Sequence, residues 1–167
     1  MLMVIFLPAL VSAESVYETR AQFLNRAFSS GPPQPAVTWL SGERKSMVRQ
    51  LLDHDYPALR LRYWCRDSRS AWVLEEIGKE LPITVGIIIE RDYISSLRVL
   101  TYRENRGGEV ATASFSDQFE GVSLKDDGGL ATQIDGITGA TLSVQALSRL
   151  ATMALFLHAD SDCSNGP

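Results

Sequence analysis

The segment that could carry chemistry runs from Ile134 to Ser143, where glycines and hydroxyl side chains precede an apolar, helix-like stretch. Gly136 and Gly139 permit backbone conformations that other residues avoid, and they let a bulky group approach the main chain. Thr141 and Ser143 are expected at the start of the following helix. The first N–H groups of a helix are unpaired and favour a phosphate. A threonine hydroxyl at this point could therefore hold a phosphate ester.

The same residues also have a simpler explanation. Thr and Ser are ordinary N-cap residues, and Gly is common ahead of a helix. On local physics alone, the cap is favoured over the phosphate site.

A wider pattern reverses that balance. Thr138, Gly139, Ala140, Thr141, Leu142 and Ser143 follow Ser/Thr-Gly-Ala-Ser/Thr-x-Ser/Thr, and Asp135 and Gly136 stand just ahead. The pattern resembles the flavinylation motif of the FMN-binding domain family, which includes the C subunit of sodium-pumping NADH:quinone reductase and the G subunit of Rnf-type complexes. In that family a separate FAD:protein FMN transferase moves FMN from FAD onto the second Ser/Thr. The resemblance therefore implies FMN linked covalently to Thr141, with the other motif residues around it.

The resemblance covers roughly residues 59–155. It implies a loop near the flavin that contains Glu104 and Gly107, and an approach to the cofactor by Gln118 and Phe119. Other members often have Glu-Thr-Pro-Gly in that loop, whereas this chain has Glu-Asn-Arg-Gly. Two interpretations of Glu104 and Arg106 are therefore equally favoured. They contact the flavin, or they belong to an ordinary turn.

The elements that must position these residues follow from periodicity. Apolar residues at helical spacing predict helices over residues 18–29, within 37–53 with Ser41 or Ser46 as cap, and from Leu142 through Leu155. Alternating or β-branched residues predict strands over 59–64, 71–74, 82–89 and 94–102. Residues 109–119 suit a short helix or irregular structure. The prediction is an α+β fold, an antiparallel sheet of about four strands with packed helices.

The chain divides into four parts. Residues 1–13 are apolar and end in Val-Ser-Ala, which resembles a signal peptide, although no Lys or Arg precedes the run. A buried N-terminal strand or helix is the alternative. Residues 14–58 form an N-terminal helical segment, 59–158 the FMN-binding domain and 159–167 a polar tail. Export predicts a periplasmic or extracytoplasmic location, either free or held at the membrane by a partner.

Cysteines, histidines and charge exclude several classes of site. In an exported protein Cys65 and Cys163 permit one disulfide, with two free thiols as the alternative. With only His54 and His158 beside them, they make a poor zinc set, so no metal site is predicted. The net charge of -4 argues against nucleic-acid binding.

Three other positions invite a functional interpretation that a structural one outweighs. Trp64 and Trp72 could stack on a flavin ring, but core packing on the predicted hairpin is favoured. Lys79, which follows a glycine, is most simply a turn residue.

The resulting prediction is a non-catalytic electron carrier, because no acid–base pair for a second substrate is evident. The flavin supplies the redox chemistry, and the protein passes electrons between membrane or periplasmic partners. Two alternatives stay open: a catalytic flavin reductase that acts on a small acceptor, and an interaction module without flavin.

Overall fold

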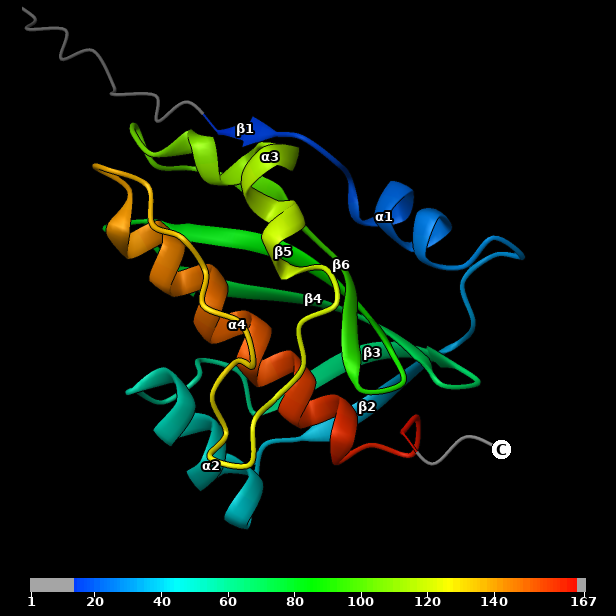
Figure 1. Ribbon diagram of the computed structural model, residues 1–167. Coiled ribbons are helices and arrows are strands. Elements are labelled where there is room, and N and C mark those ends of the chain that lie inside the picture. Colours follow the sequence, from blue (N-terminus) through cyan, green and yellow to red (C-terminus); the bar gives the residue numbers. More distant parts are fainter. Residues whose placement is uncertain (1–13, 165–167) are drawn as a thin grey trace, which may run out of the picture.

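A six-stranded antiparallel sheet forms the centre of the computed structural model, which describes residues 14–164 (Figure 1). The strands lie in the order β1-β6-β5-β4-β3-β2. Their bounds are β1 Ser15–Val16, β2 Pro35–Trp39, β3 Arg60–Arg66, β4 Arg69–Ile77, β5 Pro82–Glu90 and β6 Tyr93–Tyr102. The helices are α1 Arg20–Ala27, α2 Gly42–Leu52, α3 Ala113–Ser116 and α4 Thr141–Ala159, with 3-10 helices η1 Gly108–Ala111 and η2 Asp117–Phe119.

The α+β class and the antiparallel sheet are confirmed, but the sheet has six strands rather than about four. The two missed strands, β1 and β2, form its opposite edges. Val37 to Trp39, whose apolar residues are counted with the helical spacing of residues 37–53, form a strand that pairs with β3. Val37 and Trp39 are exposed on this edge strand. Counted together with the apolar residues of the following helix, they give an apparent helical spacing. That helix begins at Gly42, with Ser41 as its N-cap residue.

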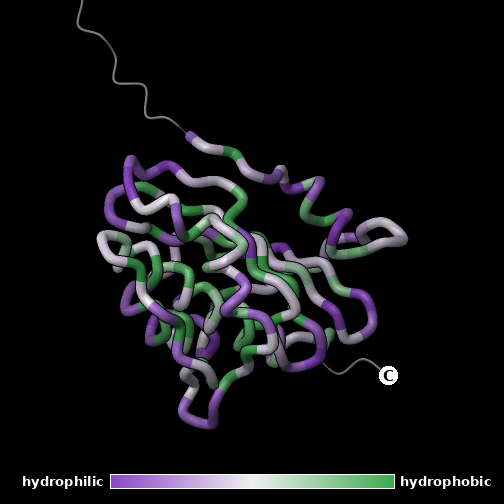
Figure 2. Tube along the Cα trace, turned by 45° about the horizontal axis from the view of Figure 1, so that its top comes forward, coloured by the Kyte–Doolittle hydropathy of each residue, from purple (hydrophilic) through white to green (hydrophobic). Residues whose placement is uncertain are grey.

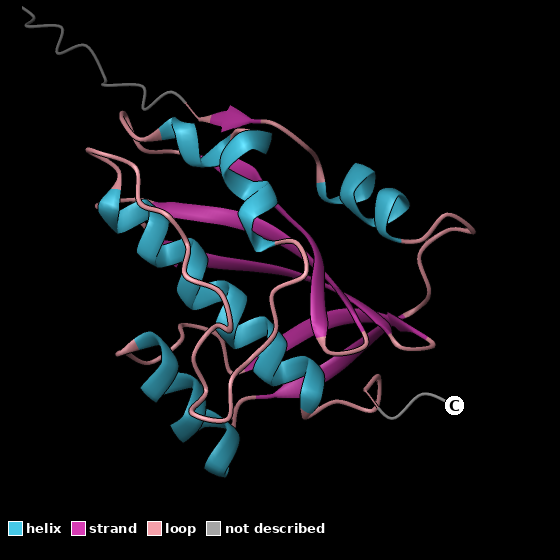
Figure 3. Cartoon of the chain, viewed as in Figure 1, coloured by secondary structure: helices cyan, strands magenta, loops and turns pink. Residues whose placement is uncertain are grey.

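Helix α4 supplies most of the core on one face of the sheet. Its apolar residues pack against β4, β5, β6 and α2, and Leu147, Leu150 and Met153 are fully buried. Figure 3 shows α4 running across the strands, with α2 beside it. Within the described residues, α4 is the one helix long and apolar enough to cross a membrane by length and composition, yet 61% of that stretch is buried in the protein. It is therefore the core helix of this domain.

Side chains alternate along the strands, so the sheet has a hydrophobic core on each face. Trp72 stacks on Tyr63 at 4.6 Å between ring centroids, on the face covered by α4. Trp64 packs on the other face, beneath α1. Both tryptophans are buried, so the core-packing interpretation is confirmed. In Figure 2 hydrophobic segments lie mostly in the interior and hydrophilic ones along the outer loops.

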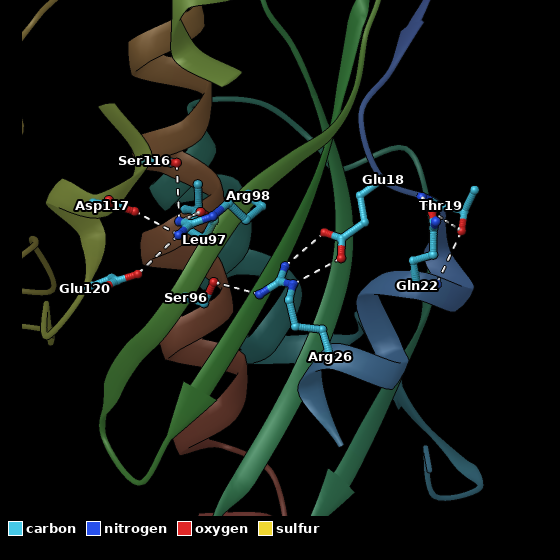
Figure 4. Close-up of polar contacts among 10 residues, drawn as sticks. All are labelled: Glu18, Thr19, Gln22, Arg26, Ser96, Leu97, Arg98, Ser116, Asp117 and Glu120. Atoms are coloured by element: carbon cyan, nitrogen blue, oxygen red, sulfur yellow. Dashed lines mark hydrogen bonds and ion pairs between the residues drawn. The ribbon is translucent and has the colours of Figure 1, made fainter. Parts of the chain in front are cut away.

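Helix α1 is fixed on the second face by a close contact and by polar bonds. Phe23 lies over Gly86, where an added Cβ would come within 2.6 Å of its ring. Arg26 donates to Glu18 and to Ser96 (Figure 4). The N-terminal segment thus belongs to the same folded unit as the rest of the sheet.

An arginine on β6 binds the segment that contains α3 and η2. Arg98 on β6 pairs with Asp117 at 2.8 Å and Glu120 at 3.4 Å, and donates to Ser116 (Figure 4). These bonds place η2 against the sheet, and the chain then runs to the start of α4.

A disulfide joins Cys65 on β3 to Cys163 after α4. The sequence left this pairing open. The disulfide holds residues 160–164 against the domain, and Cys163 is only 1% exposed.

Loss of this disulfide should destabilise the domain. The bridge joins residues 98 positions apart, and removing so large a loop constraint costs about 2–4 kcal/mol of unfolding free energy. Urea unfolding of the Cys65→Ala, Cys163→Ala double variant should show this loss, and reductant should bring the wild type to the same value. If reductant leaves the unfolding free energy of the wild type unchanged, the pairing is contradicted.

Candidate functional site

Thr141 is the first residue of α4, and a tight turn delivers it there. The Ala140 N–H donates to the Ile137 carbonyl at 3.0 Å, with Thr138 and Gly139 between them. Gly139 has φ +84°, the value required of the third residue in a type II turn. The glycine therefore permits the turn that leaves the Thr141 side chain exposed at the helix start.

The start of α4 offers free backbone donors. Ala140 is the N-cap, and it provides no side-chain hydrogen bond to the helix. Among the described residues, no acceptor bonds the N–H groups of Thr141, Leu142 and Ser143. The simple cap interpretation of Thr141 is therefore wrong, since Thr141 lies inside the helix and its hydroxyl caps nothing. A phosphate at this helix start would find these donors unpaired.

A cleft of about 500 Å³ opens beside Thr141. Three segments line it: the β4–β5 turn with Lys79 and Glu80, the loop after β6 with Glu104, Asn105 and Arg106, and the helix start from Gly139 to Ser143. Small-molecule sites commonly have volumes of this order. The cleft thus brings together segments from three parts of the sequence.

The carboxylate of Glu104 holds the turn that forms one wall. Its Oε1 accepts the backbone N–H groups of Lys79, Glu80 and Leu81, at 2.6, 2.6 and 2.9 Å. Burial of the carboxyl opposes ionisation, but the three N–H groups outweigh it and hold the pKa of Glu104 below its usual value. Glu104 therefore shapes the cleft wall, and its contact with a flavin stays a prediction.

Tyr102 ties the opposite wall to α4. Its Oη donates to the Arg106 carbonyl at 2.5 Å and lies 3.0 Å from Ser143 Oγ. Because a carbonyl only accepts, the Ser143 hydroxyl must donate to Oη. Burial raises the pKa of Tyr102, against the effect of the Ser143 bond, so the phenol keeps its proton at neutral pH. Ser143 is buried and structural rather than free to react.

Gly107 lets this loop approach the helix start. It has φ +85°, and an added Cβ would lie 2.8 Å from Tyr102 Oη and 3.0 Å from the Ala140 Cβ. Only glycine satisfies both the backbone angle and the lack of space. The loop at Gly107 consequently packs closely against Ala140 of the motif.

The structure brings most of the predicted site residues together. Glu104, Gly139, Ala140, Thr141, Leu142 and Ser143 line the cleft. Gly107 and Thr138 line an adjoining cavity, which shares Asn105, Arg106 and Gly139 with the cleft. Asp135 and Gly136 line neither, although Gln118 Oε1 accepts the Asp135 N–H at 2.8 Å. Phe119 is fully buried in the core.

Sequence reasoning missed the turn at Lys79 and Glu80 as part of the site. Lys79 does lie in a turn, as predicted, but the turn is also a wall of the cleft. No local pattern reveals this, because the turn is placed by Glu104 from a distant strand end.

The comparison with known families agrees with this geometry. Residues 78–155 match the FMN-binding domain, a span that begins at the Gly78 turn and ends within α4. The match supports an FMN-binding domain in this part of the chain. It contains all three segments that line the cleft. No curated protein matches the chain.

The cleft residues of this FMN-binding domain fit the cofactor. Lys79 and Arg106 bring positive charge, the start of α4 brings free N–H groups, and Leu142 leaves an apolar side chain 47% exposed at the rim. Lys79 pairs with Glu80 at 3.5 Å, whereas among the described residues Arg106 forms no ion pair. A flavin phosphate near Thr141 would therefore meet donors and an unpaired cation.

Glu104→Gln should lower stability in a pH-dependent way. The folded pKa lies below the usual value, so the stabilisation is complete above the unfolded pKa, near 4.5, and is lost as pH falls through the folded pKa. We expect a loss of about 1 kcal/mol at neutral pH that shrinks under acid conditions, measured by urea unfolding across pH. Glu80→Gln is the matched control. An equal loss at all pH values would contradict this role.

Two glycines with nearly equal positive φ provide a second test. Alanine at Gly139 incurs only the left-handed backbone cost of about 1–2 kcal/mol, since nothing lies within 4 Å of its Cβ. Alanine at Gly107 adds a clash with Tyr102 and Ala140, worth about 1–3 kcal/mol more. Equal melting temperatures for the two variants would show that the loop and the helix start are not packed as described.

Proposed function

We propose that this protein is an exported electron carrier whose FMN is linked through its phosphate to Thr141. One observation carries the proposal. In an FMN-binding domain, Thr141 presents an exposed hydroxyl at the first residue of α4 and beside the cleft. The neighbouring hydroxyls differ, since Ser143 is buried and bonded to Tyr102 and Thr138 lies on the preceding turn.

Attachment would need an FAD:protein FMN transferase as partner. The Thr141 oxygen attacks the phosphorus on the FMN side of FAD, the bond to the bridging oxygen breaks, and AMP leaves. The hydroxyl proton passes to the transferase. The resulting diester keeps one negative charge, which the N–H groups of α4 and the Arg106 guanidinium are placed to stabilise.

The flavin supplies one- and two-electron chemistry when bound. The chain's own residues tether it, shape the cleft and set its electrostatic surroundings. Glu104, a carboxylate that lines the cleft, is engaged by three backbone N–H groups and is ionised at neutral pH. It therefore does not act as a proton donor there, which supports a carrier over a reductase that acts on a small acceptor.

Two features support export to the periplasm or another extracytoplasmic site. Residues 1–13, which lie outside the described residues, have the composition of a signal peptide. The Cys65–Cys163 disulfide is typical of proteins in oxidising compartments. A covalent tether also prevents loss of the cofactor there, and the electron donor and acceptor would be membrane or periplasmic redox proteins.

Substitution of Thr141 tests the proposal. The protein is co-expressed with an FMN transferase, and its intact mass and its in-gel flavin fluorescence are measured. The wild type and Thr132→Val, a matched control at an exposed threonine outside the motif, should carry FMN, whereas Thr141→Val should not. Thr141→Ser should keep the modification, because it keeps the hydroxyl.

Two results would contradict it. An unmodified wild type, with a transferase that modifies a control substrate, would favour an interaction module without flavin. Rapid oxidation of a small electron donor by the loaded protein alone would favour the reductase.

A further inference from the structure

A second cleft, of about 590 Å³, lies at the other end of α4. It is bounded by Leu155 and His158 of α4, by Arg91 and Asp92 of the β5–β6 turn, and by Leu124 of the loop after η2. A helix rises about 1.5 Å per residue, so His158 lies about 25 Å from Thr141. This cleft is therefore separate from the flavin site.

His158 on its wall is buried and lacks one hydrogen bond. The side chain is 1% exposed, and Nε2 has no partner among the described residues. Nδ1 lies 2.7 Å from Ser70 Oγ, which also accepts the Trp72 Nε1–H at 2.8 Å. A buried polar atom without a partner is uncommon in folded proteins.

The Ser70 contacts decide which ring nitrogen of His158 carries the proton. Ser70 is fully buried, and its own hydroxyl proton has His158 Nδ1 as the acceptor in reach. Nδ1 is then the acceptor and Nε2 carries the hydrogen. The opposite tautomer would leave both the Ser70 proton and the Nε2 lone pair unsatisfied. The unpaired atom is therefore an N–H donor.

The ring is neutral at physiological pH. Burial lowers the pKa of His158, and it outweighs the opposing effects of the Arg91 carbonyl and the Asp92 and Glu90 carboxylates. The Arg91 carbonyl is near enough to influence the pKa but does not make a hydrogen bond of ordinary geometry to Nε2. A ligand oxygen would satisfy this donor better.

The rest of the cleft indicates the kind of ligand. Among the described residues, the Arg91 guanidinium forms no ion pair, so positive charge is available at the rim. Leu124 and Leu155 provide an apolar wall. Asp92 beside Arg91 disfavours ligands of high negative charge. An acceptor oxygen, one negative charge and a short apolar body are the features that match these groups.

We infer that this cleft binds a small organic monocarboxylate, with an oxygen on His158 Nε2–H, its charge near Arg91 and its apolar part against Leu124 and Leu155. The inference does not depend on the flavin, and it can be tested on flavin-free protein. It adds a ligand site at the far end of the helix that carries Thr141.

The test is titration of the folded protein with butyrate, followed by the ring ¹H–¹⁵N resonances of the two histidines. His158 should shift saturably, while His54, which bonds Glu76 on a different part of the surface, serves as the internal reference. Butyramide at equal ionic strength should bind much more weakly, because it lacks the charge.

Variants of two arginines complete the test. Arg91→Gln, which removes the charge but keeps a polar side chain, should weaken butyrate binding by about tenfold. Arg62→Gln, at an exposed side chain on β3, should leave it unchanged, and both variants should melt as the wild type does. Absence of a saturable His158 shift, which would mean that only water meets Nε2, would overturn the inference. So would equal binding by butyramide or by the Arg91 variant.

Discussion

The packing of α4 on the sheet is the constraint on which the rest of the structure depends. Its apolar face fills the space over β4, β5 and β6, and this burial supplies much of the core. A helix seated this firmly fixes both of its ends. Thr141 is held at one end and His158 at the other, each beside a cleft that the loops complete.

Polar contacts convert the Thr141 end into a cleft with defined walls. Glu104 gathers three backbone N–H groups of one turn, and Tyr102 links the neighbouring loop to Ser143. Both residues follow or end β6, so one strand end organises two walls. The contacts of Glu104 and Tyr102 therefore position the exposed Thr141 hydroxyl, which forms no hydrogen bond of its own among the described residues.

The sequence predicted the parts that local pattern controls. Strand alternation such as Leu61 and Tyr63 facing inward located β3, and the motif around Gly139 and Thr141 located the helix start. Edge strand β2 was not predicted, because Val37 and Trp39 on it are exposed and their spacing with the following apolar residues resembles that of a helix. Its pairing with β3 depends on contacts that the local sequence does not contain.

The remaining site features depend on residues distant in sequence. Lys79 lines the cleft because Glu104, on another strand end, holds its turn. The ring proton of His158 lies on the unpartnered Nε2 because Ser70, 88 positions away, donates to Nδ1. A single sequence gives no signal for either arrangement, whereas a motif within six consecutive residues is visible at once.

The central claim is the identity of the residue that carries the flavin, and fragmentation mass spectrometry tests it most directly. Trypsin should release residues 126–149 as one peptide, which contains Thr138, Thr141 and Ser143. From protein made with an FMN transferase, we expect the flavin phosphate on Thr141. Assignment to Thr138 or Ser143, or FMN that leaves the denatured protein without a covalent bond, would contradict the account.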